Sequence, residues 1–114
     1  LSPLPALTDS VYLEGFTQSG AGVYDIIIDG SVAKGTGLVV QNGLSNVNIS
    51  GLTIRNFQNG LLMGVNSSEA RIDSNKFLNN GISAIQLSSG SRNNRVSNLQ
   101  ITNSGIGISF SGLN

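Results

Sequence analysis

The stretch from residue 72 to residue 82 reads Ile-Asp-Ser-Asn-Lys-Phe-Leu-Asn-Asn-Gly-Ile. Apolar and polar residues alternate on both sides of one break, a pattern typical of two short β-strands joined by a bend. The pattern recurs, because Ile49 precedes Ile72 and Val96 follows it at nearly equal offsets along the chain. A fixed period of roughly 20 to 50 residues indicates stacked structural units, each covering the apolar face of the next.

A second apolar pattern extends this repeat along the chain. Its members are almost evenly spaced, with a slightly longer first interval, and they predict a first sheet from residues 11–13, 38–40, 61–63, 85–87 and 108–110. The same alignment predicts a second sheet from residues 26–28, 47–49, 70–72 and 94–96, and a third from residues 52–54, 75–77 and 99–101. Gly and Asn between these runs tolerate the left-handed conformation of sharp corners, and no window has helical spacing. The sequence therefore predicts an all-β solenoid of about five coils of 23–27 residues, with three short strands per coil.

The composition bounds the domain organisation and excludes several function classes. A chain of 114 residues is long enough for one core, so we expect a single segment with an initial part at 1–22 and regular coils at 23–114. Charged residues make up 11% and the net charge is zero, so no field favours nucleic acid or an anionic membrane. Without His or Cys, imidazole and thiolate catalysis and the usual zinc ligands are excluded. We expect neither a metal nor a cofactor.

The expected location is extracellular or at the cell surface. The chain starts at Leu1 rather than at Met, and it has neither a signal-peptide pattern nor an apolar run near about 18 residues. We therefore expect part of a longer chain, in a segment that does not itself insert into a membrane.

The repeated unit at residues 72–82, with its echoes from Val47 and Val96, carries a resemblance. Residues 46–112 resemble the right-handed parallel β-helix family, the pectate-lyase-like solenoids. The opening of the chain, at residues 4–8, 11–15 and 17–20, looks like the beginning of large bacterial surface β-helix repeat proteins. The resemblance implies the fold but no single function, because this scaffold hosts lyases, hydrolases, epimerases, adhesins and inert stalks.

Asparagines are predicted to stabilise the stack rather than to bind a ligand. Asn56, Asn79 and Asn103 superpose when the repeats are aligned, so their amides are expected to hydrogen-bond along the stack as a ladder. Asn75 aligns with inward leucines, and its amide is expected to bond to backbone groups at a turn.

The outward positions of the predicted first sheet offer no catalytic group. They are Tyr12, Val39, Leu62, Gln86 and Ser109. None of them is an acid, a base or a calcium ligand of the usual kind. The six carboxylates scatter, and the alignment brings no acidic pair together in adjacent coils.

Arg71, Arg95, Lys76 and Tyr12 are the candidate ligand-binding residues. The two arginines align one coil apart, with Lys76 nearby in sequence, and stacked cations suit a uronate or sulfate group on a glycan. Asp73 lies diagonally between the arginines, so a solvated ion cluster is the competing interpretation. Tyr12 opens an early coil, where an aromatic ring stacks on a sugar or, alternatively, seals the end of the solenoid.

The regular coils and the lack of a catalytic constellation predict a non-catalytic extracellular module, either a stalk or an adhesive surface that contacts polysaccharide. One alternative is a fragment of a polysaccharide lyase, epimerase or glycoside hydrolase whose catalytic residues lie outside this segment; long inserted loops between coils would favour it. Another is a self-associating repeat whose exposed end coils add head to tail into filaments.

Overall fold

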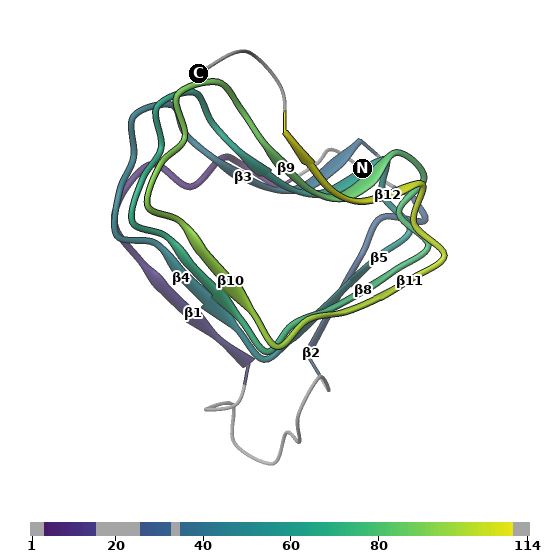
Figure 1. Cartoon of the computed structure of the whole chain (residues 1–114). Coiled ribbons are helices and arrows are strands. Elements are labelled where there is room, and N and C mark those ends of the chain that lie inside the picture. The colour runs from purple at the N-terminus through teal and green to yellow at the C-terminus, as the bar shows by residue number, and fades with distance from the viewer. Residues whose placement is uncertain (1–3, 16–25, 33–34, 111–114) are drawn as a thin grey trace.

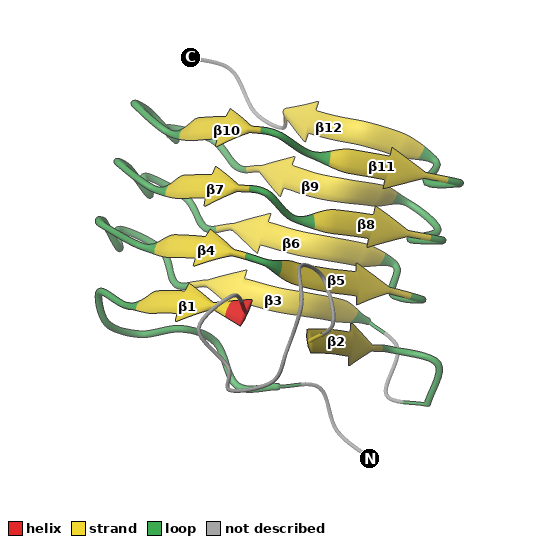
Figure 2. Ribbon diagram, turned by 90° about the horizontal axis from the view of Figure 1, so that it is seen from below, coloured by secondary structure: helices red, strands yellow, loops and turns green. Residues whose placement is uncertain are grey.

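Three parallel β-sheets surround a common interior. A computed structural model describes residues 4–15, 26–32 and 35–110. Viewed down the axis, the backbone winds around the three sheets in turn (Figure 1). Viewed from the side, each strand lies next to its equivalent one coil away (Figure 2). The prediction of an all-β parallel solenoid with three strands per coil is confirmed.

Each sheet contains four strands in the described residues. Sheet A consists of β3 (Thr36–Val40), β6 (Asn59–Met63), β9 (Ser83–Leu87) and β12 (Ile106–Phe110). Sheet B consists of β1 (Tyr12–Glu14), β4 (Asn48–Ser50), β7 (Arg71–Asp73) and β10 (Arg95–Ser97). Sheet C consists of β2 (Ile26–Asp29), β5 (Leu52–Arg55), β8 (Lys76–Leu78) and β11 (Gln100–Thr102). The described strands therefore make three full turns from β3 to β12, fewer than the predicted number of about five coils.

The register of the later coils follows the predicted period. Leu61 pairs with Leu38 on one side and with Ile85 on the other, as the alignment of the repeats requires. Ile72 pairs in the same way with Ile49 and Val96. Equivalent side chains therefore lie one strand spacing apart, about 4.8 Å.

The first coil departs from the predicted alignment. Residues 11–13 were predicted to lie beside 38–40 in the first sheet, but Leu13 pairs with Ile49 in sheet B. That prediction is wrong, and so is the placement of Tyr12 on the outer face of the first sheet. Leu7 occupies the position beside Val40 instead.

The placement of residues 26–28 in the second sheet is wrong for the same reason. Ile28 pairs with Ile54 in sheet C. Ten residues separate Gly15 from Ile26, whereas Gly51 is followed directly by a strand of sheet C. Because of this extra length, the strands of the first coil are not spaced like those of the later coils. An alignment that assumes one period for the whole chain therefore assigns them to the wrong sheets. The predicted boundary between residues 22 and 23 lies outside the described residues.

The interior consists of stacked rows of apolar side chains. The fully buried members include Ile49 and Ile72 from sheet B, Ile54 and Phe77 from sheet C, and Leu61, Met63 and Ile85 from sheet A. Alternation along each short strand places these residues inward and their neighbours outward. Burying one such side chain contributes about 1.5–3 kcal/mol, and every inner coil has apolar neighbours on both sides.

The corners are rows of residues in the left-handed conformation. Before sheet B the row is Asn46, Glu69 and Asn93, with φ of 61°, 56° and 56°. Between sheets B and C it is Gly51, Ser74 and Asn98, with φ of 74°, 57° and 51°. After sheet C it is Asn56, Asn79 and Asn103, with φ of 64°, 55° and 52°. Asn and Gly predominate because they adopt this conformation at low cost. Among the described residues there is no helix long and apolar enough to span a membrane.

Candidate binding groove on sheet B

The outward side chains of sheet B form two rows in register. The first, the arginine row, consists of Tyr12, Asn48, Arg71 and Arg95. The second, the carboxylate row, consists of Glu14, Ser50, Asp73 and Ser97. The two rows lie two residues apart along the strands, so every outward position of sheet B is polar or aromatic.

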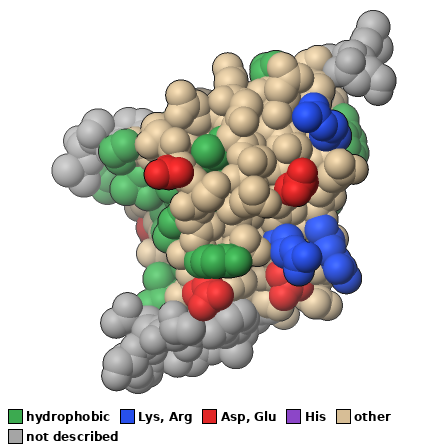
Figure 3. All heavy atoms as spheres, turned by 90° about the vertical axis from the view of Figure 1, so that its left-hand side faces the viewer, with side chains coloured by type: hydrophobic (Ala, Val, Ile, Leu, Met, Phe, Trp, Pro, Cys, Tyr) green, Lys and Arg blue, Asp and Glu red, His purple; other side chains and the backbone are tan. Residues whose placement is uncertain are grey.

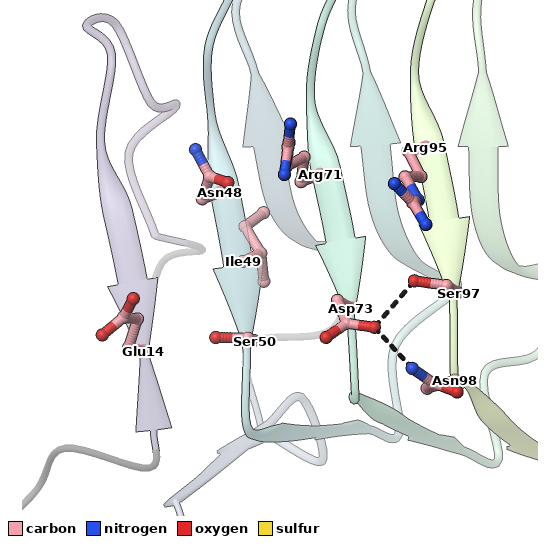
Figure 4. Close-up of a pocket in the computed structure, with 9 residues that line it drawn as sticks. All are labelled: Glu14, Asn48, Ile49, Ser50, Arg71, Asp73, Arg95, Ser97 and Asn98. Atoms are coloured by element: carbon pink, nitrogen blue, oxygen red, sulfur yellow. Dashed lines mark hydrogen bonds between the residues drawn. The ribbon is translucent and has the colours of Figure 1, made fainter.

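All members of the two rows except Tyr12 line a groove on this face. The groove has a volume of about 620 Å³ and also includes Asn98, from the bend after β10 (Figure 4). A smaller hollow of about 260 Å³ lies beside it, lined by Asn46, Glu69, Ala70 and Asn93 together with Arg71 and Arg95. The two arginines thus line both hollows. On this side of the molecule, basic and acidic side chains lie among a mostly uncharged polar surface (Figure 3).

Arg71 and Arg95 are exposed neighbours on β7 and β10. Neither guanidinium forms a hydrogen bond or a direct ion pair with any other residue that the structure describes. Like charges at one strand spacing repel each other. The pair therefore carries ten N–H donors in two planar groups, five per guanidinium, on an exposed face.

Asp73 is held by hydrogen bonds from its own coil and the next. Its Oδ1 accepts from Ser97 Oγ at 2.7 Å and from Asn98 Nδ2 at 2.9 Å (Figure 4). Its Oδ2 accepts from Ser74 Oγ at 3.1 Å. The hydrogen bond from Ser97 and then that from Asn98 lower the pKa of Asp73, and the positive charge of Arg95 lowers it further. Asp73 is therefore a carboxylate at neutral pH.

Glu14 and Asp73 share the carboxylate row, with Ser50 between them. Two strand spacings put their backbone positions about 10 Å apart. The sequence alignment missed this relationship because it placed the first strand in another sheet. The signal that would have found it is the ten-residue separation of Gly15 from Ile26, compared with the direct step from Gly51 to Leu52.

The predicted ligand-binding residues do not all lie together. Tyr12 begins the arginine row and is 74% exposed, so the structure brings it onto the same face as Arg71 and Arg95. Lys76 lies on β8 in sheet C, in register with Thr53 and Gln100, and faces another side of the solenoid.

Asn56, Asn79 and Asn103 occupy equivalent corners, but their amides do not form a ladder within the described part of the chain. The amide of Asn56 donates to Asp29 Oδ1 at 3.1 Å, and no amide-to-amide bond joins the three side chains. The backbone N–H groups instead link the coils, from Asn56 to the carbonyl of Leu78 at 3.1 Å.

Two other asparagines point inward. Asn75 is fully buried and bonds to the backbone of Leu52, Ile49 and Asp73. Asn80, which the sequence analysis did not single out, is also fully buried and bonds to the backbone of Phe57 and Ile54.

Asp29 forms a separate cluster on sheet C. It accepts hydrogen bonds from the backbone N–H of Ser31 at 2.8 Å and from Arg55 Nε at 2.9 Å. The hydrogen bond from Asn56 is the largest of the effects that hold the pKa of Asp29 well below its usual range. These partners satisfy the carboxylate internally. In the described residues, no group of three or more carboxylates has the arrangement of a metal site.

A chain wound through three parallel sheets, with one strand of each sheet per coil, is a parallel β-helix. A model of the family described as "Right handed beta helix region" matches residues 8–114. The chain therefore belongs to the right-handed β-helix family. No curated protein and no solved structure is significantly similar to it.

Proposed function

We propose that the chain is a non-catalytic extracellular β-helix module that contacts acidic carbohydrate through the groove on sheet B. One observation carries the proposal. Arg71 and Arg95 lie in register on an exposed sheet face and have no hydrogen bond or ion pair with another described residue. An arginine without an internal partner on a grooved face suits a carboxylate or a sulfate, because the guanidinium binds such groups through two parallel hydrogen bonds.

The remaining groove residues suit a sugar. Hydroxyl groups both donate and accept hydrogen bonds, and Asn48, Ser50, Ser97 and Asn98 supply both kinds of partner along the groove. The exposed ring of Tyr12 stands at the end of the arginine row, where it can stack on the apolar face of a sugar ring. A polysaccharide bearing uronate or sulfate groups would use the arginines, the polar side chains of the groove and the exposed ring of Tyr12.

The state of Asp73 does not suit the general acid of a glycosidase. Glycoside hydrolysis needs a carboxylic acid whose pKa is raised, so that it protonates the leaving oxygen. The pKa of Asp73 is lowered instead, and its oxygens already accept three hydrogen bonds.

An enzyme fragment is the second candidate, and two observations favour it. Ten residues separate Gly15 from Ile26 at a corner where the next coil has none, and long insertions between coils are where catalytic groups of such solenoids would be carried. Glu14 and Asp73 also share one face, and their backbone positions, about 10 Å apart, suit the carboxylate separation of about 6.5–9.5 Å in inverting glycosidases.

Binding of acidic oligosaccharides, measured by calorimetry on the purified chain, tests the proposal. We expect Arg71→Gln to weaken binding by about tenfold, because one charge-assisted bidentate contact is lost. Lys76→Gln is the matched control, because it removes a cation from sheet C and leaves the groove intact. Equal weakening by both variants, or no binding by the native chain, would contradict the proposal.

Turnover separates the two candidates. Incubation with acidic polysaccharides is expected to yield neither unsaturated products nor new reducing ends. Cleavage by the native chain that is abolished in Glu14→Gln would favour the enzyme instead.

A further inference from the structure

The smaller hollow beside the groove lies on the side where the strands of sheet B begin. Its volume is about 260 Å³, and the corner before the sheet contributes Asn46, Glu69 and Asn93 to its lining. Arg71 and Arg95, which begin β7 and β10, line it as well. The hollow therefore brings one carboxylate next to two guanidinium groups.

Glu69 stands in a row of asparagines. Asn46, Glu69 and Asn93 occupy equivalent corners and share a left-handed backbone, with φ of 61°, 56° and 56°. Asparagine adopts this conformation readily, whereas a longer side chain such as that of glutamate adopts it at a cost. The backbone N–H groups of Asn46 and Glu69 bond to the next coil in the same way, to the carbonyls of Ser68 and Arg92. The fold therefore does not require a glutamate at this corner.

The charge of Glu69 has no internal explanation either. Its side chain is exposed, and its carboxylate forms no hydrogen bond or ion pair with another residue that the structure describes. Arg71 and Arg95 are unpaired in the same sense. The guanidinium of Arg71 lies on the side where β7 begins, away from Asp73 (Figure 4). Charges of both signs therefore line one hollow without pairing directly with each other.

The signs of these charges decide which ligand the hollow selects. A glycan that carries only acidic groups is attracted by the two arginines and repelled by Glu69. A glycan that carries an ammonium group next to its acidic group satisfies both, because the anion pairs with a guanidinium and the ammonium with the carboxylate of Glu69. An unpaired charge that attracts one ligand and repels its competitor is a means of specificity.

We propose that Glu69 is a specificity-determining residue, and that this face of sheet B selects a zwitterionic glycan in which a uronate or sulfate lies next to an unacetylated amino sugar. The inference rests on the proposed function, because it takes acidic carbohydrate as the ligand of the arginines and adds the requirement for a neighbouring ammonium group. The contact with that ammonium offsets the conformational cost of a glutamate in the left-handed region. The N-acetylated form of the same glycan is the disfavoured ligand, since acetylation removes the positive charge.

Calorimetry with two oligosaccharides of equal length tests this inference. Both alternate a uronate with glucosamine, but the amines are N-acetylated in one and free in the other. At mildly acidic pH, where the amines are protonated and the uronates ionised, we expect the native chain to bind the free-amine form about tenfold more tightly, because a charge-assisted hydrogen bond is added. Glu69→Gln should bind the two forms equally. Asp9→Asn, which removes an exposed carboxylate outside both hollows, is the matched control and should keep the preference.

A second variant, Glu69→Asn, separates specificity from folding. Asparagine occupies the equivalent corners of the neighbouring coils, so we expect this variant to have a higher urea midpoint than the native chain and yet no preference for the free amine. A preference that survives in both Glu69 variants would overturn the inference. Equal binding of the two forms by the native chain would also overturn it and leave the proposed function standing, whereas binding of neither form would contradict both.

Discussion

The side-chain oxygen of Asn75 accepts a hydrogen bond from the backbone N–H of Leu52 at 3.1 Å, across one coil of the stack. Its amide nitrogen donates to the carbonyl of Ile49 at 2.9 Å. Both groups lie at the bend between sheets B and C, where the strand ladder is interrupted. The fully buried amide therefore completes the inter-coil hydrogen bonding that the backbone alone does not supply.

Replacing Asn75 with leucine tests this function. Leu52 and Leu99 occupy the equivalent positions in the neighbouring coils, so a leucine fits the row by shape. We nevertheless expect Asn75→Leu to lower the free energy of unfolding by about 2–4 kcal/mol, because two buried backbone groups lose their partner. Urea denaturation measures the change, with Gln100→Ala as an exposed control. A neutral effect would mean that water or a shifted backbone replaces the amide.

At Ser104 a buried amide can be added rather than removed. It stands one coil after Asn80 in the alignment of the repeats, but its Oγ is buried and has no hydrogen-bond partner in the described structure. An asparagine there would reach the N–H of Asn80 and the carbonyl of Phe77, as Asn80 reaches Phe57 and Ile54 one coil earlier. Ser104→Asn is expected to raise the free energy of unfolding by about 1 kcal/mol. Thermal denaturation of the variant checks this, and a lower midpoint than the native chain would contradict it.

A row of small residues in sheet A leaves space for aromatic rings. A Cβ on Gly60 would lie 2.6 Å from the carbonyl oxygen of Ala84 and 2.8 Å from the ring of Phe77. We expect Gly60→Ala to cost about 1–3 kcal/mol through overpacking. Gly107 follows in the same row on β12, where the nearest described atom to an added Cβ, apart from the adjoining residues, is Ile101 Cδ1 at 3.7 Å. Gly107→Ala is therefore the matched control, with an expected gain of up to about 1 kcal/mol from a less flexible unfolded chain. Equal losses would exclude ring packing as the cause.

Stability should depend on the ionisation of Asp29. Its hydrogen bonds to Asn56, Ser31 and Arg55 hold the pKa in the folded state well below the unfolded value of about 3.9. A folded-state pKa that is lowered stabilises the protein at pH values above the unfolded pKa, and the contribution is lost as the pH falls through the folded value. Urea midpoints measured from neutral pH downwards should fall less steeply in Asp29→Asn than in the native chain. If the urea midpoints of the two proteins fell equally with pH, these hydrogen bonds would not favour the ionised form of Asp29.

The later coils were predictable because their side chains repeat one short pattern. Ile49, Ile72 and Val96 align at nearly constant offsets, and the structure places them in one row that faces the interior. The register of Arg71 with Arg95 could be predicted from the sequence for the same reason. The first coil was not, because the length of an inserted segment leaves no trace in the alternation of the strands that flank it.

The sequence by itself determined which residues face the interior and how far apart the coils repeat, since a dry core requires apolar residues at every second strand position and stacking requires the same residues one coil later. Only the tertiary structure decided which other outward side chains share the face of Arg71 and Arg95. It placed Tyr12 and Glu14 beside the arginines and Lys76 on another sheet. The physical reason is that lengthening a loop costs little free energy. The register of the first coil is therefore set by its pairing with the next coil and not by the number of residues between its strands.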